Sequence, residues 1–110
     1  MTGPWTHVDA VVDWLDNAAK GQGDQTALRL LKIGEEYGEA TQAYIGAVGQ
    51  NPRKGFTHAP RDVAEELCDV ILAAMVALHG FTVTHPQDFF EAYVDTRAQR
   101  LAALTDRTQT

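Results

Sequence analysis

Cysteine, basic runs and long apolar runs are scarce in this sequence. The single cysteine, Cys68, allows no disulfide within the chain, which indicates a reducing, cytoplasmic setting. The formal net charge is −6 and no basic run is present, so we expect no nucleic-acid partner. The longest apolar run, 70–78, is too short to cross a bilayer, so we expect no membrane partner either.

Strand patterns and common nucleophile motifs are absent as well. No segment sustains an alternation of apolar and polar residues, and the one β-like run, 81–84, is short enough to be a loop. The sequence contains no GxxxxGK phosphate loop, and no Ser-His-Asp or Cys-His arrangement stands out. The sequence therefore gives no sign of a side-chain nucleophile.

Helical periodicity is what the sequence has instead. Hydrophobic residues make up 45% of the chain, which is normal for a globular domain. Because the third helical segment is apolar all round over 70–78, a domain of 110 residues is expected to need a second subunit to cover it. We predict one all-α domain over 1–110, with helices at about 6–19, 24–48, 60–79 and 86–104 and a frayed polar tail at about 105–110.

Local signals predict the helix ends and the faces that point inward. Thr6 and Asp24 are candidate N-caps, and Pro60 suits a first helical turn. Cys68 and Trp14 are expected to pack inside the protein. The predicted inward faces are Trp5, Val8, Val12, Leu15 and Ala19; Leu28, Leu31, Gly38, Thr41 and Ile45; Val63, Leu67, Val70, Ile71, Ala74 and Leu78; and Phe90, Tyr93, Val94, Arg97, Leu101 and Leu104.

Two glycines interrupt the second predicted helix. Gly34 and Gly38 each cost about 1 kcal/mol relative to Ala inside a helix. We expect a close approach of two helices beside these glycines to offset that cost.

Acidic residues form the central motif of the sequence. Glu36 and Glu39 lie three residues apart in the second predicted helix, and Glu66 and Asp69 lie three apart in the third. Residues at this spacing share one helix face, so two packed helices would direct four carboxylates to one place. Oxygen ligands in that number suit Mg²⁺ or Mn²⁺. The alternative is a pair of solvated acidic faces, although few basic residues accompany these carboxylates.

Basic residues that could contact an anionic ligand are few. The loop predicted at 49–58 holds the only adjacent basic pair, Arg53-Lys54, and is either a phosphate-binding flap or a plain connector. Arg97 and Arg100 could reach an anionic ligand if the fourth helix lies over the acidic motif, and a solvated face is the alternative.

The paired acidic motif resembles that of a known enzyme family. Glu35-Glu36-x-x-Glu39 followed by Glu66-x-x-Asp69 is similar to the signature of the MazG-like, all-α nucleoside triphosphate pyrophosphohydrolases, over about 27–78. The resemblance implies a bundle of four to five helices that assembles into a homodimer or homotetramer. It also implies a house-cleaning activity that cleaves a dNTP or modified NTP between its α- and β-phosphates, giving a nucleoside monophosphate and pyrophosphate.

The resemblance assigns roles to particular residues. Glu35 matches an extra glutamate that holds a second ion or orients the attacking water. The residues that match the Mg²⁺ ligands, with Mn²⁺ as a possible substitute, are Glu36, Glu39, Glu66 and Asp69. By extension, the expected phosphate contacts are Lys32, Lys54, Arg97 and Arg100.

Three other functions compete with this interpretation. A phosphoribosyl-ATP pyrophosphohydrolase has a first motif like the run 32–36, but the Tyr-His pair expected after Asp69 is missing. A di-iron bundle would need Glu-x-x-His pairs, which neither Glu39 nor Glu66 begins. A non-catalytic nucleotide-binding or oligomerisation module would keep the fold without turnover.

Overall fold

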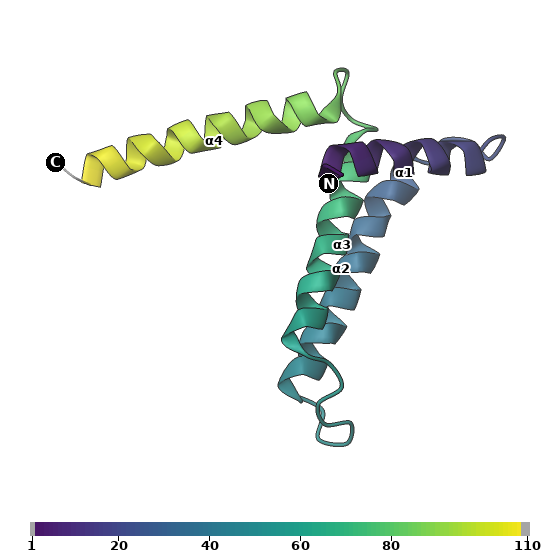
Figure 1. The fold of residues 1–110 in the computed structure, drawn as a ribbon, viewed down its shortest axis with the longest axis vertical. Helices are drawn as coiled ribbons and strands as arrows, with labels where there is room; N and C mark the ends of the chain where they lie inside the picture. Colours follow the sequence, from purple (N-terminus) through teal and green to yellow (C-terminus); the bar gives the residue numbers. More distant parts are fainter. Residues whose placement is uncertain (1, 109–110) are drawn as a thin grey trace. The chain divides into compact units, whose positions relative to one another are not determined.

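The protein is all-helical in the computed structural model, which describes residues 2–108 (Figure 1). The all-α prediction is confirmed, and the β-like run at 81–84 forms no strand. The chain divides into two compact units, with the division between Gly80 and Phe81. No helix among the described residues has the length and apolarity that a bilayer crossing requires. The helices are α1 (Pro4–Ala18), α2 (Thr26–Val48), α3 (Pro60–Leu78) and α4 (Pro86–Thr108).

The start of α1 differs from the sequence prediction. The helix begins at Pro4 with Gly3 as its N-cap, so the assignment of Thr6 as the cap is wrong. Proline at the first helical position has a backbone already set for the helix and lacks only an N–H that would be unpaired there. The helix therefore starts before the polar residue that the sequence favoured.

Asp24 precedes α2 rather than capping it. The N-cap is Gln25, and Asp24 Oδ1 accepts hydrogen bonds from the Thr26 backbone N–H at 2.9 Å and from Thr26 Oγ1 at 2.6 Å. These bonds, led by that from the Thr26 hydroxyl, lower the pKa of Asp24 below its ordinary value because they stabilise the ionised form. The helix ends at Val48, and the φ of 65° at its C-cap, Gly49, suits a residue without a Cβ.

The remaining helix ends combine one confirmed prediction and one difference. Pro60 opens α3 as predicted, and Asp62 Oδ2 accepts a hydrogen bond from the Ala59 N–H at 2.8 Å. By contrast, α4 runs to Thr108, beyond the predicted end near 104. Residues 105–108 of the predicted frayed tail thus continue the helix, and 109–110 lie outside the described residues.

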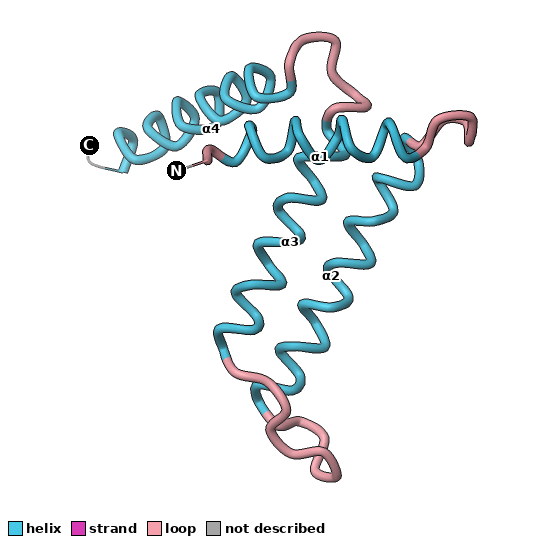
Figure 2. Tube along the Cα trace, turned by 45° about the vertical axis from the view of Figure 1, so that its right-hand side comes forward, coloured by secondary structure: helices cyan, strands magenta, loops and turns pink. Residues whose placement is uncertain are grey.

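The α2–α3 hairpin is the framework of the first unit. The two helices lie side by side and antiparallel (Figures 1 and 2). The buried residues of α2 are all small: Ala40, Ala43 and Gly46. Small side chains let helix axes approach closely, so the hairpin packs tightly along this face.

The predicted inward faces of α2 and α3 are wrong for the single chain. Leu28 and Leu31 are 60% and 68% exposed, and Leu67 and Ile71 of α3 are also exposed. Cys68, which was expected in the core, is exposed too. Apolar periodicity identified residues that suit burial, but within this chain the small residues fill the helix–helix contact and the large ones face outward.

The close approach predicted at Gly34 and Gly38 lies elsewhere. A Cβ added at either residue would meet open space. At Gly46, by contrast, a Cβ would overlap the side chains of Thr57 and His58, and the Gly46 carbonyl accepts a hydrogen bond from the Thr57 N–H at 3.1 Å. The glycine that the packing requires is therefore Gly46, where the connecting loop folds back on α2.

Helix α1 crosses the end of the hairpin where α2 begins and α3 ends (Figure 2). Val8 and Val12 are buried, as the predicted stripe requires, whereas Trp14 is 68% exposed and does not pack as expected. The contact between α1 and α3 also has a polar part, in which Asp9 Oδ1 lies 3.2 Å from His79 Nε2 at the C-terminus of α3. This crossing leaves a hollow between the three helices.

Candidate metal centre

Three of the predicted metal ligands converge between α2 and α3. One carboxylate oxygen from each of Glu36, Glu39 and Glu66 lies within 4.8 Å of the other two. Glu36 and Glu66 are half-buried, and Glu39 is exposed. The three-residue spacing puts Glu36 and Glu39 on one face of α2, and the close helix contact brings Glu66 of α3 to the same place.

One oxygen of this group has no ordinary partner. Glu66 Oε2 is buried and makes no hydrogen bond within the described part of the chain. A buried carboxylate oxygen without a partner is costly, and like charges a few ångströms apart repel. A hard divalent cation would offset both costs, and carboxylate oxygens are the type of ligand that suits Mg²⁺ and Mn²⁺. The residues present therefore fit such an ion.

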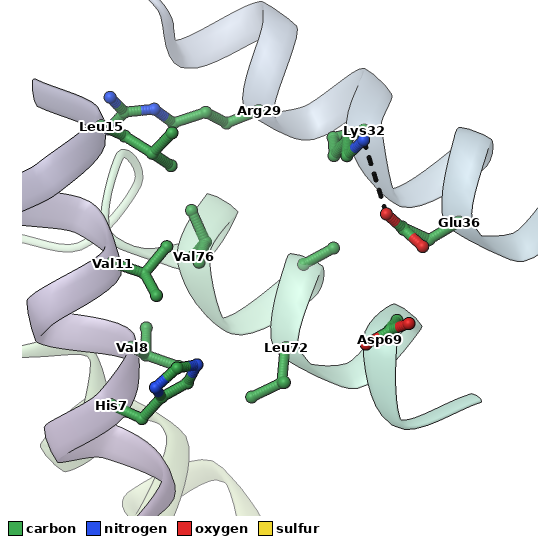
Figure 3. A pocket seen from close by; sticks show the side chains of 11 residues that line it. His7, Val8, Val11, Leu15, Arg29, Lys32, Glu36, Asp69, Leu72 and Val76 are labelled. Atoms are coloured by element: carbon green, nitrogen blue, oxygen red, sulfur yellow. Dashed lines mark ion pairs between the residues drawn. The ribbon is translucent and has the colours of Figure 1, made fainter. Parts of the chain in front are cut away.

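Asp69 lies beside this group rather than within it. It is exposed and is not among the three carboxylates that come within 4.8 Å of each other. Together with Glu36 it lines one end of the hollow between the helices, and Figure 3 shows the two carboxylates on facing helices. The structure thus brings together three of the four predicted ligands and leaves Asp69 at the rim.

Lys32 is the nearest positive charge to the carboxylates. Its Nζ lies 3.0 Å from Glu35 Oε1 and 3.4 Å from Glu36 Oε1 (the Glu36 pair is dashed in Figure 3). Glu35, and to a smaller extent Glu36, raises the pKa of Lys32 above its ordinary value because both stabilise the ammonium form. The Glu35 side chain is 62% exposed and is held by Lys32 outside the group of three carboxylates.

The other predicted phosphate contacts belong to other segments of the chain. Lys54 lines a separate hollow of about 330 Å³ with Gly46 and Thr57. Gly46 is ten residues beyond Glu36, which corresponds to about 15 Å along a helix. Arg97 and Arg100 belong to α4 in the second unit, where Arg97 Nε donates to Tyr93 Oη at 2.9 Å.

The hollow beside the carboxylates contains residues that the sequence did not single out. It has a volume of about 310 Å³ and lies between α1, α2 and α3. Arg29 of α2 and His7 of α1 line it, together with Lys32, Glu36 and Asp69. Arg29 could have been found from its spacing, because it lies two helical turns before Glu36 on the same face. His7 has no such signal, because its place depends on how α1 crosses the hairpin.

Comparisons with protein-family models, with curated proteins and with solved structures find no match to this chain.

Proposed function

We propose that this chain is a MazG-like, all-α nucleoside triphosphate pyrophosphohydrolase. In this proposal it hydrolyses a dNTP or a modified NTP between the α- and β-phosphates, with Mg²⁺ or Mn²⁺ as cofactor. The products are a nucleoside monophosphate and pyrophosphate. The proposal starts from the paired acidic motif and its resemblance to that family.

The convergence of Glu36, Glu39 and Glu66 is the observation that carries this proposal. Their oxygens come within 4.8 Å of one another from two different helices, although 26 residues lie between Glu39 and Glu66 in the sequence. A solvated acidic face on each helix would not need to meet its counterpart. The partly buried positions of Glu36 and Glu66 also favour a site over a solvated surface.

The residues around the carboxylates suit phosphate chemistry. A divalent ion held by Glu36, Glu39 and Glu66 would acidify a water molecule and offset the charge of the phosphate chain. Asp69 lies close enough along α3 to orient water or to complete the ligand set. Lys32 supplies a positive charge beside Glu36, where a phosphate oxygen would lie. Glu35 pairs with Lys32 and would position that ammonium group in the resting protein.

A second copy of the chain is part of this proposal. Several large apolar side chains of the hairpin are exposed: Leu31, Tyr37, Tyr44, Leu67 and Ile71. A groove of about 270 Å³ between α2 and α3 is lined by Tyr37, Tyr44, Val63 and Leu67, among others. An exposed groove lined by aromatic and aliphatic side chains favours an interaction surface. We therefore propose a homodimer or homotetramer that buries this surface.

The test is a metal-dependent assay of pyrophosphate release. Purified protein is incubated with NTPs and dNTPs and with Mg²⁺ or Mn²⁺, and pyrophosphate and nucleoside monophosphate are measured. We expect both products from at least one nucleotide and a loss of at least about a hundredfold in Glu36→Gln, because a charged ligand is removed from the cluster. Glu65→Gln is the matched control, since Glu65 pairs with Arg61 at 3.0 Å and lies outside the cluster.

The other outcomes discriminate between the competing functions. Release of orthophosphate would show that a different bond is cleaved. Turnover of phosphoribosyl-ATP alone would favour the phosphoribosyl-ATP pyrophosphohydrolase alternative. Nucleotide binding without any product, in the presence of either metal, would favour a non-catalytic module and would overturn the proposed activity.

A further inference from the structure

The hollow between α1, α2 and α3 has an apolar middle and charged ends. Its apolar walls come from α1 and α3 and include Val8, Val11, Leu72 and Val76 (Figure 3). One end carries Glu36 and Asp69, beside the carboxylate group. Its volume of about 310 Å³ is near the lower end of the range of about 300–1,000 Å³ that is typical of small-molecule sites. A ligand that fits must therefore be compact, with an apolar body, and an anionic end could lie at the carboxylates only through a bound cation.

Arg29 lies at the other end of this hollow. It precedes Glu36 by seven residues, or about 10 Å along the helix axis, so the two side chains mark the length of the site. Figure 3 shows the Arg29 side chain extending from α2 toward Leu15 of α1. The side chain is only 19% exposed, and its Nη2 lies 2.7 Å from Asp16 Oδ1. This ion pair links α1 to α2 and fixes the guanidinium in place.

The ion pair also determines what Arg29 can recognise. Asp16 offsets its charge, so the guanidinium is less suited to a phosphate than an unpaired arginine would be. Its remaining N–H groups are donors only, because a guanidinium accepts no hydrogen bond. The group that they suit is a neutral acceptor, such as a carbonyl oxygen at the edge of a flat heterocycle.

We infer that this hollow holds the nucleoside part of the substrate and that Arg29 selects bases with a carbonyl group at C6 of a purine or C4 of a pyrimidine. Guanine, hypoxanthine, uracil and thymine present such an acceptor, whereas adenine and cytosine present an amino donor at the corresponding position. An amino group facing Arg29 would place N–H donors opposite N–H donors, and donors without acceptors in a partly desolvated site weaken binding. His7 does not discriminate in this way, because a neutral imidazole donates with one nitrogen and accepts with the other.

This inference rests on the proposed function, since it assumes that the phosphates lie at the carboxylates. It assigns the triphosphate to Glu36, Glu39 and Glu66 and the base to the Arg29 end. The apolar walls contributed by α1 and α3 then cover the faces of the base and sugar.

The experiment measures binding without turnover. Non-hydrolysable α,β-methylene analogues of dGTP, dTTP, dATP and dCTP are titrated into the full chain with Mn²⁺ by calorimetry. We expect the dGTP and dTTP analogues to bind about tenfold to a hundredfold more tightly than the dATP and dCTP analogues. In Arg29→Gln the difference should fall to within about threefold, because glutamine both donates and accepts.

Two further variants separate recognition from folding and from metal binding. Arg61→Gln is the matched control, because Arg61 is exposed and lies outside the hollow, and it should keep the base preference. Ala73→Phe fills the hollow and should weaken all four analogues by at least about tenfold. Circular dichroism checks that each variant folds, and electron paramagnetic resonance of Mn²⁺ should show unchanged metal binding in all three.

The outcomes distinguish this inference from the proposed activity. Equal binding of the four analogues to the native chain, or an unchanged preference in Arg29→Gln, would overturn the role of Arg29. Tight analogue binding by folded Ala73→Phe would show that the base lies elsewhere. A clear base preference with no pyrophosphate from any nucleotide would overturn the activity and leave the binding site standing.

Discussion

The two faces of α2 carry opposite kinds of side chain. The face toward α3 is built from Ala40, Ala43 and Gly46, which are small and buried. The opposite face carries Leu31, which lies half a turn around the helix from Ala40 and is large and 68% exposed. Small residues let the two helices approach, and that approach brings Glu66 to Glu36 and Glu39. The contrast shows that the size of the side chains, as well as their apolarity, decides which face of a helix is covered by a neighbouring helix of the same chain.

The largest expected effect comes from placing a charge on the outer face. If a second copy covers this face, Leu31→Glu removes a buried leucine twice in a two-fold assembly, at about 1.5–3 kcal/mol each. The total of about 3–6 kcal/mol corresponds to a dissociation constant raised by roughly two to four orders of magnitude. Sedimentation equilibrium measures this change. Asn17→Glu, at an exposed position of α1, is the control and should leave the dissociation constant unchanged. A native chain that is already monomeric would contradict the expectation.

A smaller effect is expected on the inner face. Gly46→Val would push a branched side chain into Thr57 and His58, so we expect a loss of about 1–3 kcal/mol in the free energy of unfolding. Urea denaturation measures it as a lower midpoint with an unchanged slope. The matched variant is Gly38→Ala on the outer face, which meets open space and should gain up to about 1 kcal/mol in the Leu31→Glu background. Equal losses at both glycines would erase the distinction between the faces.

The smallest effect concerns Asp24, which lies before α2 and belongs to neither face. Because its pKa is lowered in the folded chain, its ionised form stabilises the fold at neutral pH. That contribution is present above the unfolded pKa of about 3.9 and is lost as the pH falls through the lower folded value. Thermal melts of Asp24→Ala and the native chain should differ slightly at neutral pH and converge in acid. A difference that grows on acidification would contradict this assignment.

The helices themselves were predictable from the sequence, but their burial was not. Apolar periodicity located all four helices, and Pro60 marked the start of α3. Periodicity does not reveal which partner covers a face. It therefore predicts inward positions for Leu28, Leu31 and Ile45, which are exposed in the single chain. A helix that packs on two different partners has two apolar faces, and only the geometry of the chain shows which one is used internally.

The parts of the candidate site that depend on spacing within a single helix were predictable from the sequence. Three-residue spacing fixes Glu36 beside Glu39, and the hairpin then adds Glu66. Asp69 follows Glu66 at the same spacing, yet it faces the neighbouring hollow with Arg29 and His7. That hollow depends on the crossing of α1 over the hairpin, and the Arg29–Asp16 pair spans two helices. No pattern within a single segment carries this information.

Lys32 gives the acidic group a resident counterion. Its ammonium lies 3.4 Å from Glu36 before any ion arrives, and its raised pKa keeps it charged across the physiological range. In the proposed function, a divalent ion approaching Glu36 would therefore meet a competitor of the same sign, and its binding would exchange one positive charge for another. The apparent affinity for the proposed metal would then depend partly on how easily Lys32 turns from Glu36 toward Glu35, or toward a phosphate that accompanies the ion.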